Sequence, residues 1–123
     1  MLLDTYAWIE FFQGSEKGKK VENILKREKC YTGIVSLAEV IEWCLKNDFN
    51  PKKFLDIINK GSIVIGLNES IVLLAGEINF QNKKRISNWG MIDSLIYATT
   101  LFYELKVITG DKHFQDLANV VFL

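Results

Sequence analysis

The sequence predicts an α/β protein in which helices cover both faces of a mainly parallel β-sheet. Short apolar segments alternate along the 123 residues with longer segments of helical periodicity, an alternation typical of βαβ crossovers. Hydrophobic residues make up 49% of the chain and charged residues 24%, which is the composition of an ordered globular protein. This length suits one domain, so we expect residues 1–123 to form a single unit.

Five segments are predicted as strands because they are short, apolar and bounded by polar or turn-forming residues. They are residues 2–3, 30–32, 62–65, 106–109 and 118–123. The last of these would be an edge strand.

Helices are predicted between these strands, where apolar residues recur three and four positions apart. They cover residues 6–12, 16–29, 36–45, 51–61, 71–78 and 91–105. Gly14 is expected to end the first helix, and Pro51 suits the first turn of the fourth.

Four acidic residues stand where the predicted elements begin or end: Asp4, Glu39, Asp93 and Asp111. Asp4 and Asp111 follow strands, and the loops at the carboxyl ends of strands in an open α/β sheet converge on one crevice. Glu39 and Asp93 lie early in helices that would start over the same edge. We therefore expect the four carboxylates to form one cluster.

Each of these acids also has a purely structural explanation. Asp4 and Asp111 can cap the helix or turn that follows them. Glu39 stands three residues after Ser36, which is the spacing of a capping box, and Asp93 can complement a helix dipole. The set of four, rather than any one of them, supports a functional site.

A cluster of this kind requires a cation, because two carboxylates about 5 Å apart repel by roughly 3 kcal/mol at an effective dielectric near 20. Oxygen ligands suit Mg²⁺, with Mn²⁺ as a substitute, whereas zinc would usually bring cysteine or histidine. Such an ion assists attack of water on phosphorus. Thr109 can donate its hydroxyl to a carboxylate or to the phosphate, or simply fill the end of a strand.

Rival chemistries find little support in the sequence. There is no glycine-rich motif for a dinucleotide or nucleoside triphosphate and no nucleophile elbow. The single histidine, His113, is predicted to be exposed and noncatalytic. Cys30 and Cys44 lack the spacing of a metal or redox pair and are predicted to be buried thiols.

The formal net charge is zero, so any contact with nucleic acid must come from local patches. Basic residues cluster at positions 17–20, 26–29 and 83–85, either to track phosphates or as solvated helix faces. No apolar run approaches the roughly 18 residues that span a bilayer, which predicts a soluble, cytoplasmic protein without membrane contact.

Four motifs resemble, in order, those of the PIN-domain nucleases, and the likeness covers essentially the whole chain. Among these nucleases, a stand-alone domain of this length most resembles the VapC-type toxins of toxin–antitoxin pairs. The motifs are Leu2-Leu3-Asp4-Thr5, Ser36-Leu37-Ala38-Glu39, residues 93–98 and residues 107–114.

The resemblance implies a three-layer α/β/α fold with a five-stranded parallel sheet and a Mg²⁺-dependent endoribonuclease that cuts RNA. It also implies frequent homodimers and a small antitoxin protein that holds the enzyme inactive. Its acidic quartet falls on Asp4, Glu39, Asp93 and Asp111 as metal ligands, with Thr109 as a neighbouring hydroxyl. Asp4 and Asp93 are expected to bind the metal most directly.

The chain departs from the family pattern at His113, where many relatives carry another acid. Asp116 is the candidate replacement, although we expect it to be exposed. Two alternatives to a toxin stay open: a noncatalytic PIN-like module that binds RNA or protein, and an RNA-processing PIN nuclease outside any toxin–antitoxin pair. The aromatic first helix, with Trp8, Phe11 and Phe12, is expected in the core or else lining a groove for an antitoxin segment.

Overall fold

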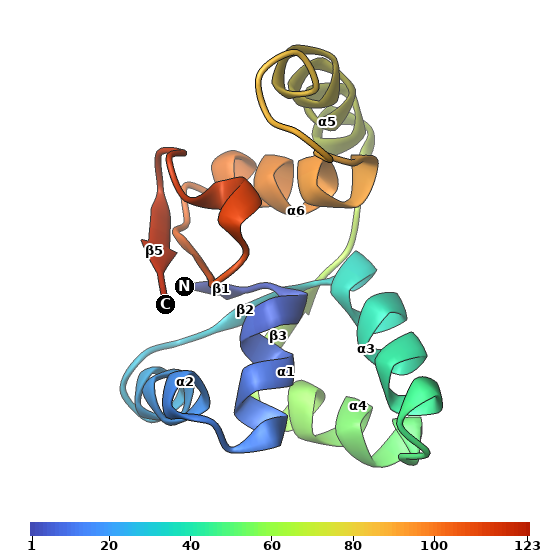
Figure 1. Cartoon of the computed structure of the whole chain (residues 1–123), viewed down its shortest axis with the longest axis vertical. Helices are drawn as coiled ribbons and strands as arrows, with labels where there is room; N and C mark the ends of the chain where they lie inside the picture. The colour runs from blue at the N-terminus through green and yellow to red at the C-terminus, as the bar shows by residue number, and fades with distance from the viewer.

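The computed structural model describes all 123 residues, which fold into three layers with a parallel sheet in the middle (Figure 1). The strands are β1 (Leu2–Leu3), β2 (Tyr31–Gly33), β3 (Ile63–Ile65), β4 (Val107–Thr109) and β5 (Val120–Phe122). The helices are α1 (Thr5–Gln13), α2 (Glu16–Arg27), α3 (Ile34–Lys46), α4 (Pro51–Gly61), α5 (Glu69–Asn82), α6 (Met91–Phe102) and the short 3-10 helix η1 (Lys112–Phe114). The predicted α/β/α fold is confirmed.

The five strands pair in the order β3-β2-β1-β4-β5, and every pair is parallel. The central strand, β1, lies between β2 and β4, with Leu2 opposite both Tyr31 and Val107. Because β1 and β4 run side by side in the same direction, the residues that follow them emerge at one edge of the sheet. Asp4 and Asp111 are therefore neighbours, as the sequence predicted.

Both faces of the sheet are covered, and adjacent residues of one strand serve opposite faces. Leu3 belongs to the core under α1 to α4, whereas Leu2 belongs to the core under α6. Figure 1 shows these four helices on one side of the sheet, with α6 on the other side and α5 packed against α6. This alternation explains why both residues of β1, Leu2 and Leu3, are apolar and wholly buried.

The aromatic residues of α1 lie mainly in the core, as the first of our two interpretations predicted. Trp8 is wholly buried, and its indole N–H donates to the Thr32 hydroxyl at 3.0 Å. Phe12 is partly buried and meets Phe54 edge to face, with 4.6 Å between the ring centroids. The two cysteines are also buried and unpaired, which confirms their prediction.

The start of α3 differs from the prediction. The helix begins at Ile34 rather than Ser36, because β2 leads directly into it and Gly33 occupies the cap position without a side-chain hydrogen bond. Ser36 is consequently buried inside the helix. The capping-box explanation of Glu39 is wrong, since Ser36 caps nothing.

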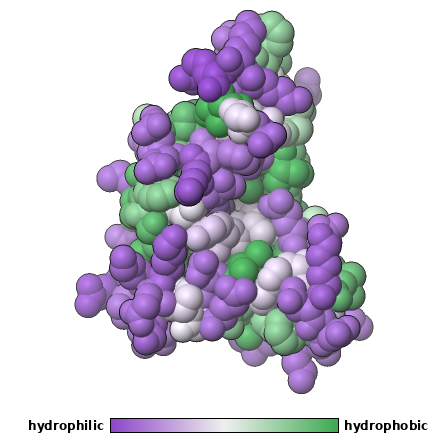
Figure 2. Space-filling model, in the orientation of Figure 1, coloured by the Kyte–Doolittle hydropathy of each residue, from purple (hydrophilic) through white to green (hydrophobic).

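The surface drawn in Figure 2 is mostly hydrophilic, with hydrophobic side chains in separate patches rather than one continuous area. None of the helices combines the length and the apolar character that crossing a membrane requires.

Candidate metal centre

Acidic side chains from four segments meet at the carboxyl edge of β1 and β4. Asp4 stands between β1 and α1, and Asp111 stands between β4 and η1. Asp93 lies in the first turn of α6. Glu39 projects from α3 and accepts a hydrogen bond from the hydroxyl of Thr5, the first residue of α1.

Asp4 is the most deeply buried acid of the cluster, with 3% of its surface exposed. Its Oδ1 accepts the Ala7 N–H at 2.8 Å, so it does cap α1. The pKa of Asp4 is raised to about 7. Burial is the largest cause, hydrogen bonds from Thr109 and Ala7 act against it, and the charges of Asp111 and Glu39 add to it. A cap alone would not require a buried carboxylate that faces two other acids.

Asp93 is half-buried and held in place by the start of its own helix. One carboxylate oxygen accepts the Gly90 N–H at 3.0 Å. Burial is the largest influence on the pKa of Asp93 and raises it; Asp111 also raises it, whereas Gly90 and His113 lower it. Its structural role at the helix start is therefore confirmed, alongside its place in the cluster.

Glu39 shows the same pattern. Burial raises its pKa first, the hydrogen bond from Thr5 lowers it, and the charges of Asp93 and Asp111 raise it again. The four acids thus lie close enough to act on one another's protonation, which is the convergence that the sequence predicted.

Thr109 links two of these acids. Its hydroxyl oxygen accepts the Asp111 N–H at 2.9 Å, and its hydrogen bond to Asp4 lowers the pKa of that buried acid. Asp111 in turn caps η1, because its Oδ1 accepts the His113 N–H at 2.9 Å. The hydroxyl therefore holds the backbone of Asp111 and the carboxylate of Asp4.

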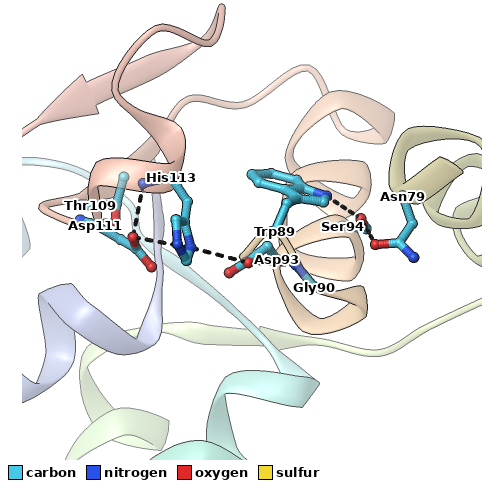
Figure 3. A network of polar contacts seen from close by, with 8 residues as sticks. All are labelled: Asn79, Trp89, Gly90, Asp93, Ser94, Thr109, Asp111 and His113. Atoms are coloured by element: carbon cyan, nitrogen blue, oxygen red, sulfur yellow. Dashed lines mark hydrogen bonds and ion pairs between the residues drawn. The ribbon is translucent and has the colours of Figure 1, made fainter. Parts of the chain in front are cut away.

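His113 lies between two of the acids, and the prediction that it would be exposed is wrong. Its side chain is 31% exposed, and its Nδ1 stands 3.4 Å from a carboxylate oxygen of both Asp93 and Asp111 (Figure 3). The three ligand atoms lie within 4.8 Å of one another. Nδ1 is buried and makes no hydrogen bond of good geometry.

The short helix η1 explains this placement. It turns the chain immediately after Asp111, so that the ring two residues later folds back over the ends of the strands. The only signal in the sequence was the Asp-x-His spacing, which is weak by itself. Asp116, by contrast, is exposed as expected and lies outside this group of three.

A set of polar and aromatic residues next to the acids connects α5, α6 and η1, and the sequence did not predict it. The Trp89 indole N–H donates to the Ser94 hydroxyl at 2.7 Å, and Ser94 donates to Asn79 Oδ1 at 3.1 Å (Figure 3). The Trp89 ring also packs on Phe114, with 5.1 Å between the centroids. The start of α6 and the loop of Asp111 are thereby fixed to each other.

An α/β/α fold with converging acids at the carboxyl edge of a parallel sheet defines the class of protein: an α/β protein built around a candidate metal centre. Within that class the sequence is specific, because the model of the PIN domain matches residues 1–120. The chain belongs to the PIN-domain family of nucleases.

Solved structures of toxin–antitoxin proteins share the fold. A toxin–antitoxin complex from Klebsiella pneumoniae is 20% identical, with a TM-score of 0.77 over 98% of this chain and 94% of that one. VapBC-1 from nontypeable Haemophilus influenzae is 22% identical, with a TM-score of 0.73 over 99% of this chain and 95% of that one. VapC20 from Mycobacterium tuberculosis, a toxin that cleaves the sarcin–ricin loop, is 13% identical, with a TM-score of 0.77 over 95% and 94%. No curated protein matches the sequence.

Proposed function

We propose that this chain is a divalent-metal-dependent endoribonuclease of the cytoplasm and the toxin of a VapBC-type toxin–antitoxin pair. One observation carries the proposal: Asp93, Asp111 and His113 each offer one ligand atom, and these atoms lie within 4.8 Å of one another. Membership of the PIN-domain family and the likeness to toxin–antitoxin structures support it.

The residues fit a divalent cation. The buried Nδ1 of His113 stands 3.4 Å from a carboxylate oxygen of both Asp93 and Asp111, so an unprotonated ring would add a nitrogen ligand to two oxygen ligands. Carboxylates suit Mg²⁺ and Mn²⁺, whereas imidazole favours the transition metals. We therefore infer that Mn²⁺ serves at least as well as the Mg²⁺ that the acids alone suggest, with Asp4 and Glu39 completing the negative charge.

The proposed reaction is hydrolysis of an RNA phosphodiester bond. A bound divalent ion would supply an acidified water and neutralise charge on the phosphate oxygens. The protein positions these groups: the Gly90 N–H donates to the carboxylate of Asp93, and the Thr109 hydroxyl accepts the backbone N–H of Asp111. Asp4, with its pKa raised to about 7 by burial, can exchange a proton near neutral pH.

The proposed partners are RNA as substrate, a small antitoxin as inhibitor and a second copy of the chain in a homodimer. The similar structures from Klebsiella pneumoniae and Haemophilus influenzae are complexes of toxin and antitoxin, which supports the second of these partners.

Purified protein incubated with structured and single-stranded RNAs tests the nuclease activity. We expect cleavage with Mn²⁺ or Mg²⁺, none with EDTA, and a loss of at least a hundredfold in Asp93→Asn. The matched control is Asp48→Asn, which changes an exposed aspartate that lines neither cavity beside the acids and should cleave like the wild type. Equal cleavage by the wild type and Asp93→Asn would refute the proposal, and RNA binding without turnover would favour the noncatalytic alternative.

Expression in a bacterial host tests the toxin role separately. Growth should stop when the wild type is induced and continue when Asp93→Asn is induced. It should also continue when the wild type is co-expressed with the product of a small reading frame next to its gene, where such a frame is found. Cleavage in vitro without growth arrest would instead indicate an RNA-processing nuclease.

A further inference from the structure

A polar cavity of about 450 Å³ opens beside Asp111 and His113. Four separate parts of the chain line it: the start of α1, the start of α2, the segment from the end of β4 through η1, and β5. Its main lining residues are Tyr6, Lys17, Gly110, Asp111, Lys112 and Phe122. We call it the Lys17 pocket.

Lys17 is unusual among the lysines of this chain because it is half-buried and has no acidic partner within 4.0 Å. Exposed lysines such as Lys19 and Lys26 form ion pairs with glutamates on the same helix. The ammonium of Lys17 instead donates to the Tyr6 hydroxyl at 3.1 Å and lies 5.3 Å from the centre of that ring. A partly desolvated cation with only a neutral partner favours an anionic ligand.

Tyr6 is held firmly at the wall of the pocket. A Cβ atom at Gly110 would lie 2.3 Å from Cε1 of the Tyr6 ring, so only glycine allows this ring to rest against the loop that carries Asp111. Because the Tyr6 hydroxyl already accepts from Lys17, its own hydrogen is free to donate. Tyrosine and lysine together therefore present two donors to the cavity.

A second cavity of about 330 Å³ lies on the other side of Lys112 and His113 and is lined by Arg85. Two polar cavities thus flank the candidate metal centre, and each contains a cation besides Lys112. This arrangement matches a polyanion that continues past the reacting group in both directions, such as the backbone of a nucleic acid.

We propose that the Lys17 pocket binds an RNA phosphate next to the scissile bond. Lys17 and Lys112 supply the positive charge, and the Tyr6 hydroxyl donates a hydrogen bond to a phosphate oxygen. This inference rests on the proposed function for the position of the scissile bond, but the pocket binds RNA whether or not the chain cleaves it.

Binding of a short fluorescent single-stranded RNA, followed by anisotropy in EDTA, tests the proposal without turnover. Lys17→Gln should raise Kd about tenfold at low salt and reduce the slope of log K against log salt concentration by about 0.7. Tyr6→Phe should raise Kd about threefold, because it removes one donor and keeps the ring. Lys20→Gln is the matched control: it removes an exposed lysine of the same helix that does not line the pocket, and its Kd should stay within twofold.

Equal Kd values and salt slopes for Lys17→Gln and Lys20→Gln would overturn the proposal, as would a wild type that binds no RNA. Thermal unfolding of each variant checks that the fold is kept. If RNA binding depends on Lys17 and no cleavage is seen with any metal, the nuclease function fails and the pocket stands. If cleavage is seen with an unchanged KM in Lys17→Gln, the pocket fails and the nuclease function stands.

Discussion

Replacing Asp4 by asparagine should stabilise the metal-free protein, and the gain should grow with pH. The pKa of Asp4 is raised from 3.8 to about 7 by burial, so its ionisation opposes folding. Because the pKa of Asp4 is higher in the folded state than in the unfolded state, its ionisation costs no stability below pH 3.8. The free energy of unfolding then falls as the pH rises towards 7. A pKa raised from 3.8 to about 7 corresponds to a penalty of about 4 kcal/mol at pH 8 and of about 2 kcal/mol at pH 5.

Asparagine removes this penalty while keeping the cap. Its side-chain oxygen can still accept the Ala7 N–H that Asp4 accepts now. Its amide nitrogen cannot accept from Thr109 as the carboxylate does, which costs about 1 kcal/mol. The expected net stabilisation of Asp4→Asn is therefore about 3 kcal/mol at pH 8 and about 1 kcal/mol at pH 5.

Urea denaturation in EDTA at both pH values measures these free energies of unfolding. Asp116→Asn is the control, since this exposed aspartate should change stability by no more than about 0.5 kcal/mol at either pH. The explanation fails if Asp4→Asn is no more stable than the wild type at pH 8. It fails equally if the difference between the two proteins does not change with pH.

Three further predictions concern the same region. Mn²⁺ bound to the wild type should show a nitrogen coupling in pulsed electron paramagnetic resonance, lost in His113→Ala; a wild type without the coupling would remove His113 from the ligands. Ser94→Ala should lower the free energy of unfolding by about 1–3 kcal/mol, because it leaves the buried Trp89 N–H without its acceptor, and an unchanged urea midpoint would contradict this. Gly110→Ala should cost about 1–3 kcal/mol and weaken RNA binding by displacing the Tyr6 ring, whereas wild-type stability with wild-type Kd would show that the ring moves freely.

The architecture was predictable because it depends on local patterns. Short strands that alternate with amphipathic helices allow little besides a parallel sheet, and parallel strands bring the residues after them to one edge. Asp4 and Asp111 could be paired on this ground although they lie far apart in the sequence. Because parallel strands end at the same edge of the sheet, this pairing did not depend on the exact residue at which each strand ends.

What could not be predicted depends on how the elements are rotated and packed. The turn of η1 decides that His113 faces Asp93, and no periodicity reports such a turn. Lys17, Lys19 and Lys20 carry the same charge and lie on the same helix. The orientation of α2 decides that only Lys17 turns towards Tyr6. Trp89 follows a basic, irregular segment, so nothing in the sequence indicated that it supports the site from behind.

Two adjacent residues of η1, His113 and Phe114, couple the candidate metal centre to the packing of the C-terminal segment. His113 faces the carboxylates while Phe114 is buried against Trp89, whose indole is bonded to the first turn of α6. Local opening of this short helix would withdraw two potential metal ligands and an aromatic anchor in one event. The metal centre therefore exists only while the C-terminal segment is docked, and occupancy by an ion should slow amide hydrogen exchange at Phe114 as well as at the ligands.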